Sequence, residues 1–170
     1  LLFSVLMREF VSRQQRERDV NAIARLATAT RFSMSRDELL PAIIDELIHF
    51  TQADAAAIVL HDPDSKDFQI ALSNGDLPYS TGMRIPPNHV IGRVFESGEP
   101  YLNNQADRDS MVYQVDRFSG LNAMAVTPLT VQQRKLGVLL VAKGGTIDQS
   151  TFKLLVSASD FAASAIHRLT

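Results

Sequence analysis

The sequence predicts an α+β fold, with a central antiparallel sheet of five to six strands, helices on both faces and a long helix at the N-terminus. Three observations lead to this class. Helical patterns open and close the chain, short strand-like runs follow one another through tight turns, and 170 residues with 45% hydrophobic content suit one core. Strands joined in hairpins exclude a doubly wound parallel sheet, in which strands and helices alternate.

The composition excludes several classes of function. Lys and Arg number 17 against 19 Asp and Glu, so the net charge of -2 gives no electrostatic reason to expect nucleic acid as a partner. Cysteine is absent, which excludes disulfides, thiolate catalysis, iron–sulfur ligation and cofactors attached through sulfur. A chain without disulfides fits the cytoplasm. We expect no membrane span, because the apolar stretch 1–7 is far too short to cross a bilayer.

The first 30 residues contain no Gly or Pro and predict one long helix. Its apolar ends flank a polar middle at 12–19, which leaves two interpretations: a solvated helix with frayed ends, or a helix that pairs in parallel with a second copy. We favour the pair, because two apolar ends suit two separate docking sites. We therefore assign residues 1–19 to a linker or signalling helix of a longer protein, and residues 20–170 to the globular domain. The residues at coiled-coil spacing are Phe3, Leu6, Phe10, Val20, Ile23 and Ala27.

A second helix begins at Ser35, because Ser35 and Glu38 form a capping box, and it ends near residue 52. The runs 55–61 and 68–73 then predict an antiparallel hairpin. The acidic turn between these runs lacks the Gly and the Glu that a calcium-binding loop requires at its sixth and twelfth positions, so we interpret it as a simple turn. The stripe that the second helix buries is Leu39, Ile43, Ile44, Leu47 and Ile48.

The stretch 85–100 predicts a short helix between two clear boundaries. Pro86 and Pro87 keep the entry extended, Asn88 is placed to cap the first turn, and Gly98 is placed to end the helix in a left-handed turn. So short a helix is not stable alone, and we expect it to lie on the sheet. Its apolar face consists of Val90, Ile91, Val94 and Phe95.

The remaining strands are predicted at 83–85, 101–103, 123–131 and 136–142, and a last helix begins after Asp148. The continuous apolar run 136–142 is typical of a central strand that is covered on both faces. An irregular polar segment, 104–119, contains one or two helical turns. We expect the first, second and last helices to cover one face of the sheet. The helix after Asn88 and the segment 104–119 cover the other face, where they roof a hollow.

Four stretches, in this order and spacing, resemble a GAF domain, the small-molecule and light-sensing module of signalling proteins. They are A-D-A-A-A-I-V-L at 53–60 with its D-P-D turn, I-G-R-V-F-E-S-G-E-P at 91–100, residues 120–130 with Pro128-Leu129, and L-G-V-L-L-V at 136–141. The likeness covers residues 20–170. It implies a PAS-like arrangement of the sheet. It also implies a homodimer formed by the N- and C-terminal helices, which pass a signal to an output domain.

The chain departs from the best-known members of that family. Photoreceptor members bind a bilin through cysteine, and the methionine sulfoxide reductase branch works by cysteine chemistry, so the absence of Cys excludes both here. The Asn-Lys-Phe-Asp-Glu constellation of cyclic-nucleotide members is also missing. The resemblance therefore implies either an unidentified ligand or none.

The N-terminus of the short helix is the first candidate ligand site. Its amides at His89, Val90 and Ile91 offer donors and a positive dipole end to a carboxylate or phosphate. His89 is equally well explained as a surface residue of the first turn. We expect neither haem nor a metal ion there, because no second His, Asp or Glu lies at metal-ligand spacing nearby.

Further candidates follow in the second half of the chain. Asn103, Asn104 and Asp107 offer polar contacts to a ligand or simply cap the loop, and Met111 and Tyr113 form either a lid or part of the core. Two strand residues complete the set, and the register of the strand decides which of them faces the hollow; they are Met124 and Thr127.

The sequence contains no catalytic constellation: there is no nucleophile–base pair, P-loop or dinucleotide glycine pattern. We therefore expect no enzyme activity in this fragment. Our first hypothesis is a sensory domain of a bacterial signalling protein, such as a two-component system, which is cytoplasmic and dimeric and binds a small molecule. The alternative is a ligand-free dimerisation or spacer module. A filled interior beneath the short helix favours the alternative.

Overall fold

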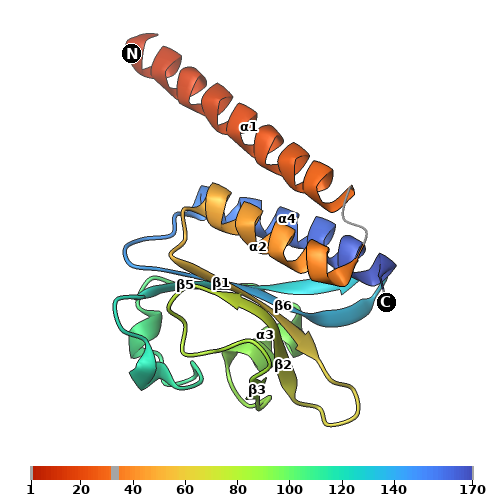
Figure 1. Ribbon diagram of the computed structural model, residues 1–170. Helices are drawn as coiled ribbons and strands as arrows, with labels where there is room; N and C mark the ends of the chain where they lie inside the picture. The colour runs from red at the N-terminus through yellow and green to blue at the C-terminus, as the bar shows by residue number, and fades with distance from the viewer. Residues whose placement is uncertain (1, 32–34, 170) are drawn as a thin grey trace.

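A six-stranded antiparallel sheet forms the centre of the molecule (Figure 1). The computed structural model describes residues 2–31 and 35–169. The strand order across the sheet is β3-β2-β1-β6-β5-β4. The strands are β1 (Ala55–His61), β2 (Phe68–Asn74), β3 (Arg84–Ile85), β4 (Tyr101–Asn103), β5 (Ala123–Val131) and β6 (Arg134–Lys143).

Strand β6 lies between β1 and β5, and this confirms the prediction that the continuous apolar run 136–142 is a central strand. Five residues of β1 and six of β6 in succession are buried, because both faces of these strands are covered. Gly137 is required where β6 pairs with β1, because a Cβ atom there would overlap the carbonyl oxygen of Val59. The register places Leu139 of β6 opposite both Ile58 and Thr127.

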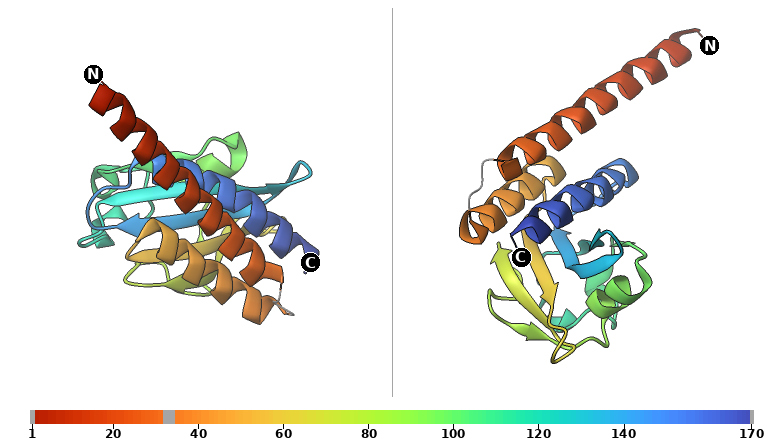
Figure 2. Two further views of the ribbon diagram at one scale, coloured as in Figure 1. Left: turned by 90° about the horizontal axis from the view of Figure 1, so that it is seen from above. Right: turned by 90° about the vertical axis from the view of Figure 1, so that its right-hand side faces the viewer.

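Two helices, α2 (Arg36–Thr51) and α4 (Gln149–Arg168), cover one face of the sheet, and α1 (Leu2–Arg31) packs on these two helices as an outer layer (Figures 1 and 2). The expectation that the first helix also covers the sheet is therefore wrong. Ser35 caps α2, with its hydroxyl oxygen accepting from the Glu38 amide, and Asp148 caps α4 by accepting from the Thr151 amide, as the sequence predicts. The stripes of α2 and α4 meet alternate residues of the strands to form a first core, which includes Ile43, Leu47, Ile58, Ala125, Leu139 and Leu155.

The opposite face carries α3 (Val90–Ser97) and the 3-10 turns η1 (Ala106–Arg108) and η2 (Val115–Arg117) (Figure 1). Gly98 ends α3 in the left-handed conformation, as predicted. The predicted cap at Asn88 is wrong by one residue. The N-cap is His89, and its side chain makes no capping hydrogen bond. The two 3-10 turns confirm the prediction of one or two helical turns in the segment 104–119, and Met111 and Val112 lie between them.

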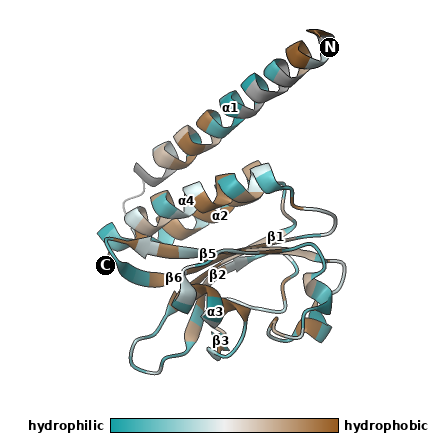
Figure 3. Ribbon diagram, turned by 180° about the vertical axis from the view of Figure 1, so that it is seen from behind, coloured by the Kyte–Doolittle hydropathy of each residue, from teal (hydrophilic) through white to brown (hydrophobic). Residues whose placement is uncertain are grey.

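Helix α1 extends well beyond the rest of the molecule (Figures 1 and 3). It buries Ala22 and Leu26 against the first core, whereas Val20 is 66% exposed. The side chains of Phe3 and Phe10 lie outside the described residues. Figure 3 shows hydrophobic ribbon at the N-terminal end of α1, where Leu2, Val5, Leu6 and Met7 are exposed. Within the described residues, no helix is both long and apolar enough to span a membrane.

Candidate functional site

The region between the sheet and its α3-side cover, which we call the α3 compartment, is filled by side chains. The prediction of a hollow beneath the short helix and the segment 104–119 is therefore wrong. A second core occupies the region, and Tyr79, Val112 and Phe118 are among its buried residues, with exposures of 1%, 3% and 8%. Its other buried members include Ile85, Val90, Ile91, Val94, Met124, Val126 and Leu140.

The N-terminus of α3 is partly occupied by the chain itself. The amide of Val90, one of the predicted anion donors, donates to the carbonyl of Met111 at 2.9 Å. Val90 and Ile91 are each 3% exposed, and both contribute to the second core. The ring of His89 lies 4.9 Å from that of Tyr113. Three of the sequence candidates, His89, Met111 and Tyr113, are thus brought together in one place.

Tyr79 is a central residue that the sequence analysis missed. Its hydroxyl donates to the carbonyl of Tyr113 at 2.5 Å, and its ring packs edge-on against Phe118 with 5.4 Å between centroids. Burial raises the pKa of Tyr79, so its hydroxyl remains a donor throughout the physiological range. No pattern in residues 75–83 predicts this contact, because it joins positions 34 residues apart.

A polar network fixes the segment after β4. The Tyr101 hydroxyl donates to Asp109 Oδ2 at 2.8 Å and accepts from Asn103 Nδ2 at 3.1 Å. Asp109 Oδ1 accepts from the Met111 amide at 2.9 Å. That amide bond and then the Tyr101 hydroxyl lower the pKa of Asp109, whereas burial and then the bond to Asp109 raise the pKa of Tyr101. The network holds Asp109 as a carboxylate and Tyr101 as a neutral donor.

The predicted polar candidates after β4 make contacts within the protein. Asn103 Oδ1 accepts from the Gln105 amide at 2.8 Å. Asn104 bonds to both backbone groups of Ile147, with its oxygen 2.9 Å from the amide and its nitrogen 3.3 Å from the carbonyl. Asp107 is exposed on η1. Asn104 therefore ties the end of β4 to the approach of α4, which agrees with the interpretation as a loop cap.

The register separates the two strand candidates. Met124 is 2% exposed and belongs to the second core, so it faces the α3 compartment. Thr127 is three residues further along β5, and its side chain therefore lies on the opposite face. There its hydroxyl lies 2.5 Å from the hydroxyl of Ser159 in α4. The assignment of Thr127 to the ligand site is wrong, because it contacts the helical layer.

Gln114, next to the compartment, has a strained backbone. It has a φ of 55°, in the left-handed region that residues with a Cβ atom avoid. Its side-chain Oε1 is buried and has no hydrogen-bond partner among the described residues. Both features have an energetic cost, and they occur at the same residue between the two 3-10 turns.

Three grooves lie on the helical side of the sheet, along α1. One groove of about 590 Å³ and another of about 220 Å³ lie between α1 and α2, where Arg25 forms an ion pair with Glu46 at 3.5 Å and donates to His49 at 2.6 Å. A third, mainly apolar groove of about 470 Å³ lies between α1 and α4. In the part of the chain that the structure describes, no three His, Asp or Glu side chains are placed to share a metal ion.

Comparison with known proteins identifies the fold. The family model of the GAF domain matches residues 33–167. No curated protein sequence matches the chain significantly.

Among solved structures, the GAF domain of a phosphoenolpyruvate-protein phosphotransferase from Coxiella burnetii is similar, with a TM-score of 0.79 and 15% identity over 89% of this chain and 94% of that one. The corresponding domain from Acinetobacter has a TM-score of 0.76 and 18% identity over 88% and 93%. The free methionine-R-sulfoxide reductase of Neisseria meningitidis has a TM-score of 0.76 and 16% identity over 89% of each chain. The six-stranded sheet, its helical cover and the family match together show that this chain belongs to the GAF domain family.

Proposed function

We propose that this chain is a regulatory module of a cytoplasmic bacterial signalling protein. A small molecule binds in the α3 compartment, and α1 and α4 of a homodimer relay the binding to an output domain. We assign the chain a binding role rather than a catalytic one. The sheet supports this proposal, because it separates the α3 compartment from the helices while its strands contribute to both cores.

The relay depends on the alternation of side chains along β5. Ala123 and Ala125 belong to the first core, beneath the helices, whereas Met124 and Val126 belong to the second. A closely packed interior transmits displacement, so a ligand that moves Met124 also moves the strand on which α4 packs. A ligand shifts the equilibrium by its difference in affinity for the two states, and a few kcal/mol, about the size of typical allosteric couplings, is sufficient.

Relatives of the same fold support the binding part of the proposal. One similar structure is a far-red-absorbing protein with bound biliverdin, and another is a phycocyanobilin-bound GAF domain of a cyanobacterial phytochrome. These chains share 14% and 17% identity with this one. Because this chain has no Cys, we propose a ligand held without a covalent bond to sulfur and no bilin attachment.

The alternative is a ligand-free dimerisation or spacer module, and the filled α3 compartment supports it. A thermal shift screen with metabolite carboxylates, nucleotides and haem separates the two. A ligand at about 100 times its Kd raises the free energy of unfolding by about 2.7 kcal/mol, which corresponds to a Tm increase of roughly 5–10 °C. His89→Ala removes that increase, whereas His49→Ala, on the other face of the sheet, retains it. If no compound raises the Tm, the spacer module is the correct description.

The dimer is tested separately. Exposed apolar side chains on α1 and α4, such as Leu6 at 55%, Val20 at 66% and Phe161 at 42%, suit burial against a second copy. We expect the full chain to have the mass of a dimer in light scattering, and deletion of residues 1–19 to give a monomer with an unchanged fold. Arg13→Ala, which keeps the helix, is the matched control. A monomeric full chain at concentrations of about 100 μM contradicts the relay.

A further inference from the structure

The segment 109–118, which we call the strap, covers the α3 compartment. Its own turns are closed by local bonds, from the Val112 amide to the Asp109 carbonyl and from the Arg117 amide to the Gln114 carbonyl. Val112 and Phe118 are buried in the second core, and Met111, Tyr113 and Val115 pack against it. The strap is therefore a small unit with internal structure, rather than an extension of a strand.

Three hydrogen bonds from neighbouring elements hold the strap down. The Val90 amide donates to the Met111 carbonyl at 2.9 Å, the Tyr79 hydroxyl donates to the Tyr113 carbonyl at 2.5 Å, and the Tyr101 hydroxyl donates to Asp109 at 2.8 Å. Two of these bonds use strap carbonyls to occupy donors of the compartment. Two donors of the compartment, the Val90 amide and the Tyr79 hydroxyl, are thus satisfied by the protein itself.

The closed strap also contains an unfavourable residue. Gln114 has the left-handed backbone conformation and a buried side-chain oxygen without a partner in the described structure. Opening of the strap relieves both costs, because the backbone relaxes and the oxygen reaches water. The free-energy difference between the closed and the open strap is therefore smaller than its buried contacts alone suggest.

We propose that the strap is a lid that opens as one unit, which frees the Val90 amide and the Tyr79 hydroxyl together and admits a ligand to the α3 compartment. The purpose of the lid rests on the proposed sensory function, but its opening is measurable without any ligand. A failed ligand screen with an opening strap refutes the function alone, and a rigid strap refutes the lid alone.

Hydrogen exchange of single backbone amides in the full chain tests the lid. The Val90 amide is the reporter, because its acceptor belongs to the strap although Val90 itself lies in α3. Tyr79→Phe keeps the ring and removes one of the three bonds, so we expect exchange at Val90 and Val112 to accelerate together by roughly fivefold. Amides of β6 such as that of Leu139 keep their rates. Tyr113→Phe is the matched control, since it removes a hydroxyl from the strap and leaves the Tyr113 carbonyl in place.

A second variant shifts the equilibrium between the open and the closed strap toward the closed state. Gln114→Gly removes the partnerless oxygen and the steric cost of the left-handed backbone, and these gains exceed the added chain entropy of glycine. We expect exchange at Val90 to slow by at least about twofold. The lid is overturned if Val90 exchanges no faster than Leu139 in the unmodified chain. It is also overturned if Tyr79→Phe accelerates Val112 alone, or if Gln114→Gly leaves the rate at Val90 unchanged.

Discussion

At the scale of single residues, the contact between β5 and α4 includes a pair of buried hydroxyls. Thr127 and Ser159 are 0% and 1% exposed, and their oxygens lie 2.5 Å apart. Ser159 donates its only proton to the Leu155 carbonyl at 2.8 Å, so Thr127 must be the donor between the two hydroxyls. Loss of Ser159 therefore leaves a buried donor without its acceptor, whereas loss of the Thr127 hydroxyl does not.

This asymmetry gives the first prediction. Ser159→Ala lowers the free energy of unfolding by about 1–3 kcal/mol, because the Thr127 hydroxyl loses its partner, while the isosteric Thr127→Val costs less than about 1 kcal/mol. Denaturant unfolding measures both values. In the double variant the interaction is removed entirely, and we expect it to be more stable than Ser159→Ala alone. An equal or greater loss in Thr127→Val contradicts the assigned direction of the hydrogen bond.

Local sequence patterns predicted most helix ends, but they did not predict which face of a strand a residue occupies. Ser35, Gly98 and Asp148 were predicted correctly, because a cap depends on the few residues around it. The N-cap predicted at Asn88 was wrong by one residue. The extended residue before the first helical turn is His89, and its side chain makes no capping hydrogen bond. Thr127 was misplaced because the face of a strand residue depends on a partner strand far away in the sequence.

At the scale of elements, the start of α4 depends on one carboxylate. Asp148 Oδ1 accepts from the Thr151 amide at 2.7 Å and from the Ser150 hydroxyl at 3.0 Å. The Thr151 bonds, first through the amide, lower the pKa of Asp148. Since α4 packs on β5 and bears part of the proposed dimer surface, its first turn affects the relay as well as the stability.

The second prediction concerns this cap and its dependence on pH. Asp148→Ala lowers the free energy of unfolding by about 1 kcal/mol at pH 7. Because the folded pKa is depressed, the ionised carboxylate stabilises the fold above its unfolded pKa of about 3.9, and the contribution is lost as the pH falls through the lower folded value. The difference between wild type and Asp148→Ala should therefore shrink below about pH 4. Asp148→Asn keeps a good cap without the titration, and a constant difference for Asp148→Ala between pH 7 and pH 3 contradicts the account.

The elements themselves were largely predictable, and their packing was not. Hydrophobic periodicity placed the hairpin, the short helix and the central strand close to their observed bounds, because each of these signals is local. The insertion of β6 between β1 and β5 is a long-range pairing that no local pattern contains. The filling of the α3 compartment depends on Tyr79 and Phe118, whose contact only the three-dimensional structure reveals.

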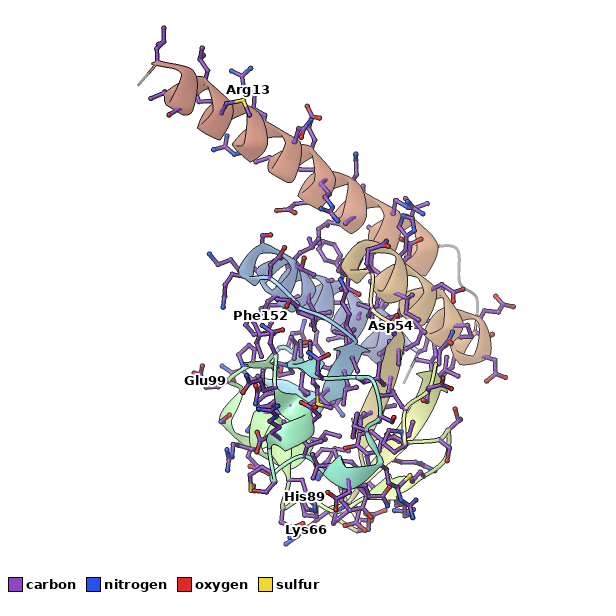
Figure 4. All side chains as sticks on the ribbon, turned by 90° about the vertical axis from the view of Figure 1, so that its left-hand side faces the viewer. Arg13, Asp54, Lys66, His89, Glu99 and Phe152 are labelled. Atoms are coloured by element: carbon purple, nitrogen blue, oxygen red, sulfur yellow. The ribbon has the colours of Figure 1, made fainter. Side chains whose placement is uncertain are left out.

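At the scale of the whole molecule, the proposed ligand site in the α3 compartment and the proposed dimer contact of α1 lie at opposite ends. Figure 4 places His89 at the end of the molecule remote from Arg13, which lies on the free half of α1. A signal that begins in the α3 compartment must therefore cross the sheet and the layer of α2 and α4 before it reaches α1. The relay requires α1 to move on the contact formed by Ala22, Leu26 and the ion pair of Arg25 with Glu46, between the grooves on its two sides.

The third prediction concerns this movement. The chain has no cysteine, so Arg13→Cys provides one unique site for a spin label on α1. In a dimer the two labels report the separation of the helices by pulsed electron resonance. Tyr79→Phe, which weakens the strap, stands in for the ligand-opened state. Tyr113→Phe serves again as the matched control.

The distance between the two Arg13→Cys labels, compared with and without Tyr79→Phe, tests the central claim that the α3 compartment and the signalling helices are coupled. We expect a shift of about 2 Å or the appearance of a second distance in Tyr79→Phe, and no change in Tyr113→Phe. A single distance that is identical in all three proteins would show that the helices do not respond to the compartment, and the coupling would be refuted.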